Sequence, residues 1–159
     1  MKSGVHGSIE AEHLDGATRP WIPFTPVSDR IHLKYFRIDP RRGELLASVR
    51  IPPGSRLAPH YLTGPLIAHT TRGSWRYSGR NWVSRAGDTV DVAAGSMHAI
   101  EGVGEDDAEL FAIFSGELLF FDEDGSLTWE ESWKTAMERY VEYCAEHWLS
   151  PHDLTRLGG

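Results

Sequence analysis

The chain has 159 residues, a single cysteine and a formal net charge of −7. This length fits one domain, one cysteine rules out an internal disulfide, and a diffuse acidic balance argues against nucleic acid or an anionic membrane as the main partner. Residues 1–13 contain no apolar stretch and no run of about 18 apolar residues occurs anywhere, so we expect neither a signal peptide nor a membrane span. The expected location is the cytoplasm.

Residues 1–20 carry little hydrophobic pattern and are predicted to form an N-terminal arm. The apolar segment Trp21 to Phe24 contains Pro23, which restricts it to a sheet edge or a turn. Short strand-like runs then follow at small intervals, with Gly or Pro between them, which is typical of an all-β sandwich or barrel. The predicted strands are 31–38, 44–51, 66–71, 75–77, 82–85, 89–92, 110–114 and 118–121.

The last part of the chain, residues 127–159, changes to a helical period. Apolar residues recur there at spacings of three and four, which predicts a helix of roughly five turns with one packed face. Thr128 followed by Glu131 indicates a capping box at its start, and Ser150–Pro151 indicates its end. The expected packed stripe is Trp133, Met137, Tyr140, Val141, Cys144 and Trp148. We therefore predict a barrel over 21–126 and a C-terminal helix over 127–159.

Two stretches of the barrel have spacings that strand periodicity does not require. They resemble the two sequence motifs of the cupin superfamily, in which glycines and histidines recur at fixed intervals. The residues in register are Gly54, His60 and Gly73 in the first motif, and Gly87, Gly95 and His98 in the second. The resemblance implies a cupin-type β-barrel, that is, a double-stranded β-helix or jelly roll, with a small-molecule site inside it.

In the cupin pattern, His-x-His aims two imidazoles to one side of a strand, because residues two apart share a face. A further His from a neighbouring strand completes one face of a divalent metal, iron in the first place, with nickel or zinc as other candidates. Here His60 and His98 occupy ligand positions, but Leu62 stands at the second His position and Leu66 at the Glu position. Either His69 or Asp91 is a candidate substitute third ligand. The other possibility is that no metal binds.

Several further stretches narrow the resemblance. Leu62–Pro65, Gly73–Tyr77, Asn81–Val83 and Ala86–Asp88 are similar to the 2,4'-dihydroxyacetophenone dioxygenase family, which is related to the ChrR-like cupins. The similarity covers about Trp21 to Leu157. It implies an oxidoreductase in which iron held by histidines inserts oxygen and cleaves a carbon–carbon bond beside a ketone.

The sequence leaves three functions open. The first is a dioxygenase-like enzyme acting on a ketone-bearing or aromatic molecule at His60 and His98, in a pocket lined by Leu62, Leu66 and Ala68. The second is a metal-free isomerase, cyclase or lyase in which the two histidines act as acid and base. The third is a non-catalytic small-molecule-binding cupin. The apolar segment at Trp21 and the aromatic helix also lead us to expect a homodimer.

Overall fold

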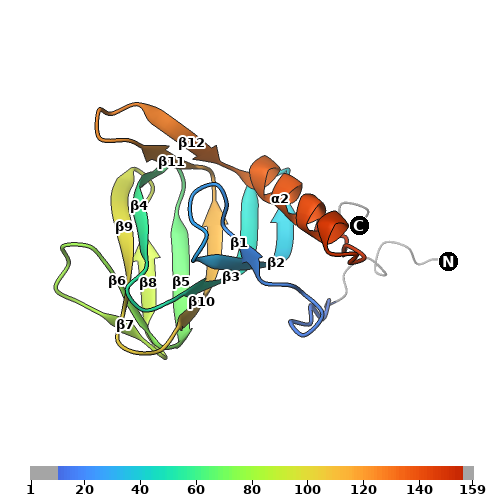
Figure 1. Cartoon of the computed structure of the whole chain (residues 1–159), viewed down its shortest axis with the longest axis horizontal. Helices are drawn as coiled ribbons and strands as arrows, with labels where there is room; N and C mark the ends of the chain where they lie inside the picture. The colour runs from blue at the N-terminus through green and yellow to red at the C-terminus, as the bar shows by residue number, and fades with distance from the viewer. Residues whose placement is uncertain (1–10, 156–159) are drawn as a thin grey trace.

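The computed structural model describes residues 11–155. Within that range, two six-stranded antiparallel sheets face each other and enclose most of the apolar core, and one helix follows them (Figure 1). The first sheet runs in the order β1 (Ile22–Pro23), β2 (His32–Asp39), β3 (Glu44–Ile51), β10 (Ala108–Ser115), β5 (Leu66–Arg72) and β8 (Thr89–Val92). The second runs β12 (Leu127–Glu131), β11 (Leu118–Phe121), β4 (Arg56–Leu62), β9 (Ser96–Val103), β6 (Ser74–Tyr77) and β7 (Ser84–Arg85).

The all-β prediction with a C-terminal helix is confirmed. Alternating burial along the strands explains the architecture, because residues two apart in a strand share a face. In β10, for example, Ala108, Leu110, Ala112 and Phe114 are buried. Strands β3, β8 and β11 have the predicted bounds, whereas the run expected over 82–85 forms a strand only at Ser84–Arg85.

Close backbone approach explains the glycine of the Leu62–Pro65 stretch. A Cβ on Gly64 would lie 1.9 Å from the carbonyl oxygen of Ser115, a distance no side chain can occupy. The turn between β4 and β5, where the chain passes from the second sheet to the first, therefore packs directly against the end of β10.

The N-terminal part of the chain packs on the first sheet. Strand β1 pairs only with β2, at the sheet edge, as Pro23 requires. In the described part of the predicted arm, the side chain of Arg19 is buried and donates to the carbonyl oxygens of Asp15 and Tyr35. Residues 1–10 of that arm lie outside the described residues.

The C-terminal segment differs from the prediction at its start. Residues 127–131 form strand β12, which pairs with β11, so the barrel extends to residue 131 instead of ending at 126. Helix α2 (Trp133–Glu146) begins after Ser132, whose side chain and Thr135 form the capping box. Thr128 cannot cap the helix, because its strand position directs its hydroxyl to the carbonyl oxygen of Phe120.

The buried face of α2 also differs from the expected stripe. It consists of Ala136, Arg139, Tyr140 and Cys144, and the helix packs against β2 and β12 (Figure 1). Val141 is half exposed, and Trp148 lies beyond the helix with 96% of its surface exposed. The helical period placed these two residues in the stripe, which is wrong: the helix ends at Glu146, before Trp148, and it buries Arg139 while Val141 stays half exposed.

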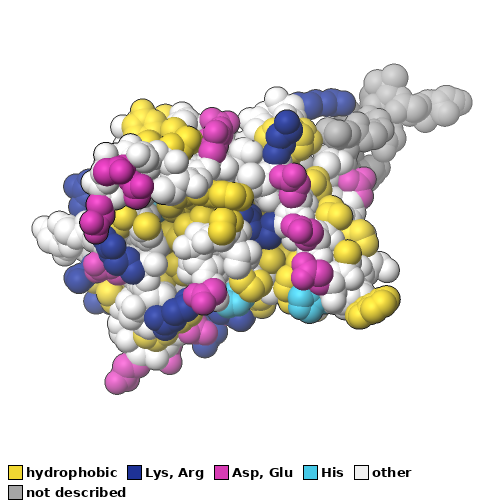
Figure 2. Space-filling model, turned by 45° about the horizontal axis from the view of Figure 1, so that its top comes forward, with side chains coloured by type: hydrophobic (Ala, Val, Ile, Leu, Met, Phe, Trp, Pro, Cys, Tyr) yellow, Lys and Arg dark blue, Asp and Glu magenta, His cyan; other side chains and the backbone are white. Residues whose placement is uncertain are grey.

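Charges are mixed on the surface. Figure 2 shows Asp and Glu side chains interspersed with Lys and Arg over the visible face, without a field of one sign. None of the described helices is long and apolar enough to cross a bilayer.

Candidate active site

His60 and His98 lie on adjacent strands of the second sheet. In the pairing of β4 with β9, His60 is directly opposite His98, so the two side chains project from the same face of the sheet. The register shifts between Leu57 and His60, where β4 contains a bulge. This irregularity keeps both Leu57 and His60 buried on the inner face, although they are three residues apart.

His60 is held in one orientation inside the barrel. Its side chain is 3% exposed, its ring contacts Phe120 with the centroids 5.0 Å apart, and Nδ1 lies 2.8 Å from the carbonyl oxygen of Ala58. A carbonyl can only accept, so Nδ1 carries the proton and Nε2 keeps its lone pair. Burial lowers the pKa of His60 to about 4, because it disfavours the charged form. At neutral pH this imidazole is therefore an uncharged hydrogen-bond and proton acceptor.

His98 has a different environment. It is partly exposed and stacks on the ring of Tyr77, with centroids 4.2 Å apart and an interplanar angle of 8°. Burial, and then the positive charge of Arg80, lower the pKa of His98. Tyr77 lies in turn against Trp75 and Trp82, with centroids 5.4 and 5.5 Å away. The imidazole of His98 thus forms one end of an aromatic wall.

The two histidines line adjoining spaces. His60 lines an inner cavity of about 110 Å³, whose other walls are almost entirely apolar. His98 lines an open pocket of about 540 Å³ beside the edge strand β8. Tyr77 lines both. The two imidazoles thus share one face of the sheet, with His60 in the interior and His98 beside the open pocket.

The residues expected to line the pocket are distributed over its walls and the core. Leu66 and Ala68 of β5 line the inner cavity. Leu62 of β4 is 1% exposed and belongs to the hydrophobic core, on the same strand face as His60. Apolar side chains therefore stand at both positions where the cupin motif has polar ligands.

The two candidate substitute ligands are exposed, and neither lines the inner cavity. His69 is exposed, pairs with Thr89 of β8 and has its Nδ1 3.0 Å from the hydroxyl of that residue. Asp91 is exposed, pairs with Ile67, which is 47% exposed, and lines the open pocket together with His98. The register of β5 with β8 is regular over these positions. The bulge that would turn His69 inward is therefore missing there.

The donor set does not fit a catalytic metal of the usual kind. Such sites in general take three or more protein ligands, and among residues 11–155 no group of three His, Cys, Asp or Glu side chains comes together. The site offers two imidazoles, from His60 and His98, which lie directly opposite each other on β4 and β9.

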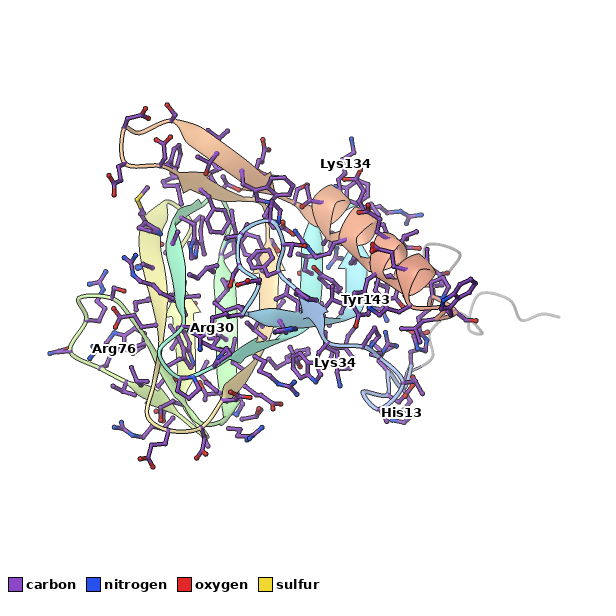
Figure 3. The ribbon with its side chains drawn as sticks, viewed as in Figure 1. His13, Arg30, Lys34, Arg76, Lys134 and Tyr143 are labelled. Atoms are coloured by element: carbon purple, nitrogen blue, oxygen red, sulfur yellow. The ribbon has the colours of Figure 1, made fainter. Side chains whose placement is uncertain are left out.

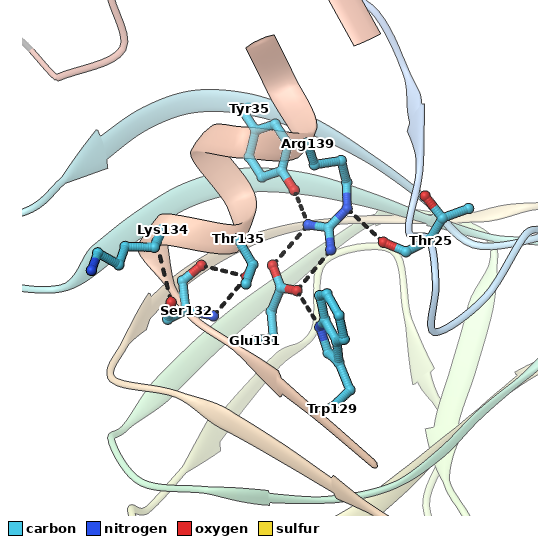
Figure 4. A network of polar contacts seen from close by, with 8 residues as sticks. All are labelled: Thr25, Tyr35, Trp129, Glu131, Ser132, Lys134, Thr135 and Arg139. Carbon is cyan, nitrogen blue, oxygen red and sulfur yellow. Dashed lines mark hydrogen bonds and ion pairs between the residues drawn. The ribbon is translucent and has the colours of Figure 1, made fainter. Parts of the chain in front are cut away.

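Sequence reasoning missed a buried polar network at one end of the cavity. Glu131 lines the cavity and forms a bidentate ion pair with Arg139 of α2, with nitrogen–oxygen distances of 2.7 and 2.8 Å (Figure 4). Arg139 also donates to the hydroxyl of Tyr35, at 2.9 Å. The helical period assigned Glu131 to a helix cap. An available signal was its eight-residue spacing from Arg139, a charged residue within the otherwise apolar stripe.

Comparison with known proteins places the fold in a family. The chain is 39% identical to an RmlC-like cupin protein from Ralstonia eutropha JMP134, over 95% of this chain and 98% of that one, with a TM-score of 0.88. It is 25% identical to a putative acetylacetone dioxygenase from Methylibium petroleiphilum PM1, over 82% and 94% of the two chains, with a TM-score of 0.73.

A third structure, the polyketide cyclase RemF from Streptomyces resistomycificus, shares the fold at 15% identity, with a TM-score of 0.59 over 72% of this chain and 89% of that one. Neither a family model nor a curated protein sequence matches the chain. The identity and coverage of the Ralstonia structure, together with the two facing sheets and the register of both motifs, show that this protein belongs to the RmlC-like cupins.

Proposed function

We propose that this cupin is an enzyme that binds an enolisable ketone in the inner cavity and uses His60 to accept a proton from it. The observation that carries the proposal is the state of His60. Its Nδ1 is held by the Ala58 carbonyl, its pKa is lowered to about 4, and it lines an otherwise apolar cavity. Nε2 is therefore an uncharged acceptor at neutral pH in a space from which water is largely excluded.

Tyr77 supplies the complementary donor. It is 4% exposed and lines the cavity, and its hydroxyl makes no hydrogen bond with any described residue. Burial raises the pKa of Tyr77 to about 12, so the phenol stays protonated and can donate. A ligand that pairs with both groups needs a proton to give to Nε2 and an oxygen to accept from Tyr77.

A ketone with a hydrogen on the neighbouring carbon meets both needs. His60 Nε2 takes that proton, the carbon–hydrogen bonding pair becomes the carbon–carbon double bond of the enolate, and the carbonyl pair moves to oxygen, where the Tyr77 hydroxyl stabilises it. Return of the proton to either end of the enolate gives exchange or isomerisation. The similarity to a putative acetylacetone dioxygenase supports a ketone as the ligand, and the apolar walls suit it.

A second candidate is metal-dependent oxygenation, which the same similarity favours. His60 and His98 would be its imidazole donors, but they do not make a three-ligand face, so we derive no step through a metal. Metal analysis of protein purified without chelators separates the two candidates. Stoichiometric iron, nickel or zinc, with activity lost on chelation, would replace the acid–base proposal with the oxygenase.

Two substitutions of His60 test the acid–base role. His60→Asn keeps an N–H near the position of Nδ1 and removes Nε2, whereas His60→Gln puts an amide group near Nε2, which can accept a hydrogen bond but not a proton. Binding of acetylacetone is followed by the fluorescence of the cavity tryptophan Trp75, and α-hydrogen exchange of acetophenone in D2O by proton NMR.

The proposal expects the parent to bind and to accelerate exchange, His60→Gln to bind without exchange, and His60→Asn to do neither. Binding without any accelerated exchange by the parent would instead identify a non-catalytic ligand-binding cupin. Circular dichroism of each variant checks that the fold is retained.

A further inference from the structure

One end of the inner cavity is closed by a carboxylate. Glu131, at the end of β12, is the only Asp, Glu, Lys or Arg among the described residues that line the cavity, and its side chain is 3% exposed. Both oxygens are engaged: Oε1 accepts from Arg139 Nη2 at 2.7 Å and from Trp129 Nε1 at 2.9 Å, and Oε2 accepts from Arg139 Nη1 at 2.8 Å (Figure 4). An Arg in this bidentate geometry pairs with an ionised carboxylate.

The cation of this pair lies behind the carboxylate. Arg139 is not part of the cavity wall but lines a separate groove between β1 and α2. Two further N–H groups are engaged, because Nε donates to the carbonyl oxygen of Thr25 at 3.0 Å and Nη1 to the Tyr35 hydroxyl at 2.9 Å. Its guanidinium also lies over the ring of Phe24, 4.9 Å from the centroid. Four of the five guanidinium N–H groups are thus engaged, and the guanidinium does not line the cavity.

The charge balance of the cavity follows from these contacts. Burial by itself would lower the pKa of Arg139, but the hydrogen bond to Glu131, with further contributions from Tyr35, raises it above its ordinary value. Burial raises the pKa of Tyr35 as well, so this phenol stays neutral. The cavity thus contains an uncharged imidazole and a carboxylate whose charge is compensated from outside. An anionic ligand in the cavity would be repelled by the Glu131 carboxylate. It would also lose its hydration shell without gaining a positive charge to pair with.

We propose that the Glu131–Arg139 pair makes the inner cavity selective for uncharged ketones over ketones that carry a carboxylate. The inference rests on the proposed function, since it concerns the ligand of the same cavity. Arg139 acts as a positioning residue: it fixes Glu131 by the ion pair, and its own charge lies outside the cavity wall. Removing Glu131 should shift the binding preference toward anionic ketones, and removing Arg139 should shift it further toward uncharged ketones.

The probes are acetylacetone and acetoacetate, which differ only in that a methyl group is replaced by the charged oxygen of a carboxylate. Dissociation constants for both are measured at neutral pH by the fluorescence titration described above. For the parent we expect acetylacetone to bind about tenfold or more tightly than acetoacetate, since an unpaired charge in an apolar site is strongly disfavoured.

Glu131→Gln keeps the shape and removes the negative charge, so Arg139 becomes an uncompensated cation beside the cavity. This variant should shift the ratio of the two dissociation constants by about tenfold or more toward acetoacetate. Arg139→Gln leaves Glu131 uncompensated and should shift the ratio further toward acetylacetone. Loss of stability alone would not move the two ratios in opposite directions.

The matched control is Glu101→Gln. Glu101 forms an ion pair with Arg76 at 2.8 Å, but neither residue lines the inner cavity. Figure 3 shows Arg76 well separated from Lys134, at the start of α2. This variant should keep the selectivity of the parent.

Each outcome bears on a different statement. A parent that binds acetoacetate as tightly as acetylacetone overturns the inference and leaves the proposed ketone site standing. A parent that binds neither probe refutes the proposed site itself. If Glu131→Gln does not fold, the double variant Glu131→Gln, Arg139→Gln restores neutrality and should keep the selectivity of the parent. A preference for acetoacetate in the double variant would contradict the inference.

Discussion

Acidification should destabilise the fold through His60. In the unfolded chain its imidazole has the ordinary pKa of 6.5, whereas in the folded protein the pKa is lowered to about 4. Between these values the unfolded state binds a proton that the folded state does not. Stability is therefore fully present above pH 6.5 and decreases as the pH falls toward 4. At about 1.4 kcal/mol for each pKa unit, the loss attributable to His60 is about 2 kcal/mol at pH 5 and about 3 kcal/mol at pH 4.

The measurement is urea unfolding of the parent and of His60→Gln at pH 7 and pH 5. Other groups titrate in both proteins, so the informative quantity is the difference between the two pH-dependent losses. The variant should lose about 2 kcal/mol less than the parent. His32→Asn is the matched control, because His32 makes the same contact with a carbonyl two residues earlier but is only partly buried.

Equal pH-dependent losses in the parent and in His60→Gln would refute this reasoning. They would show that the imidazole of His60 titrates alike in the folded and unfolded states, and hence that water reaches it. The same pKa should appear in catalysis. If Nε2 is the proton acceptor, the acidic limb of kcat/KM lies near pH 4 instead of near pH 6.5.

Three further predictions concern the metal face, the sheet crossing and the assembly. Leu62→His adds an imidazole on the strand face of His60, so thermal stability should rise steeply with added zinc or nickel in the variant and hardly at all in the parent. Without metal the variant should be less stable by a few kcal/mol, because a polar ring replaces a leucine that is 1% exposed. Tight one-to-one metal binding by the parent would contradict this. Gly64→Ala should lower stability by several kcal/mol in chemical denaturation, since its Cβ would lie 1.9 Å from the Ser115 carbonyl oxygen, whereas Gly16→Ala, with no neighbour closer than 3.7 Å, should be tolerated. Light scattering at micromolar concentration should give the mass of a homodimer, which the short edge strand β1 leads us to expect; a monomer mass at that concentration would disprove it.

The sequence by itself determined the class of fold, and it singled out His60 and His98, which the structure places opposite each other on adjacent strands. Glycines at fixed intervals from His60 and His98 mark turns that a cupin barrel needs, and strand alternation is a local property with a period of two, so both can be detected without tertiary information. The sequence also shows that apolar residues, Leu62 and Leu66, stand at two positions where the cupin motif has ligands, whatever the packing.

Only the tertiary structure decided which side of a strand faces the cavity and which distant groups meet. The register of β5 with β8 places His69 on the exposed face, whereas Asp91 of β8 lines the open pocket with His98. Register depends on pairing between segments, and a one-residue shift would exchange the faces. Glu131 was assigned to a helix cap because its local spacing fits one. Its contact with Arg139 became visible only when β12 paired with β11 and α2 packed beside it. Burial likewise decided the pKa of His60, because desolvation arises from side chains far apart in the sequence that the fold brings together around the imidazole.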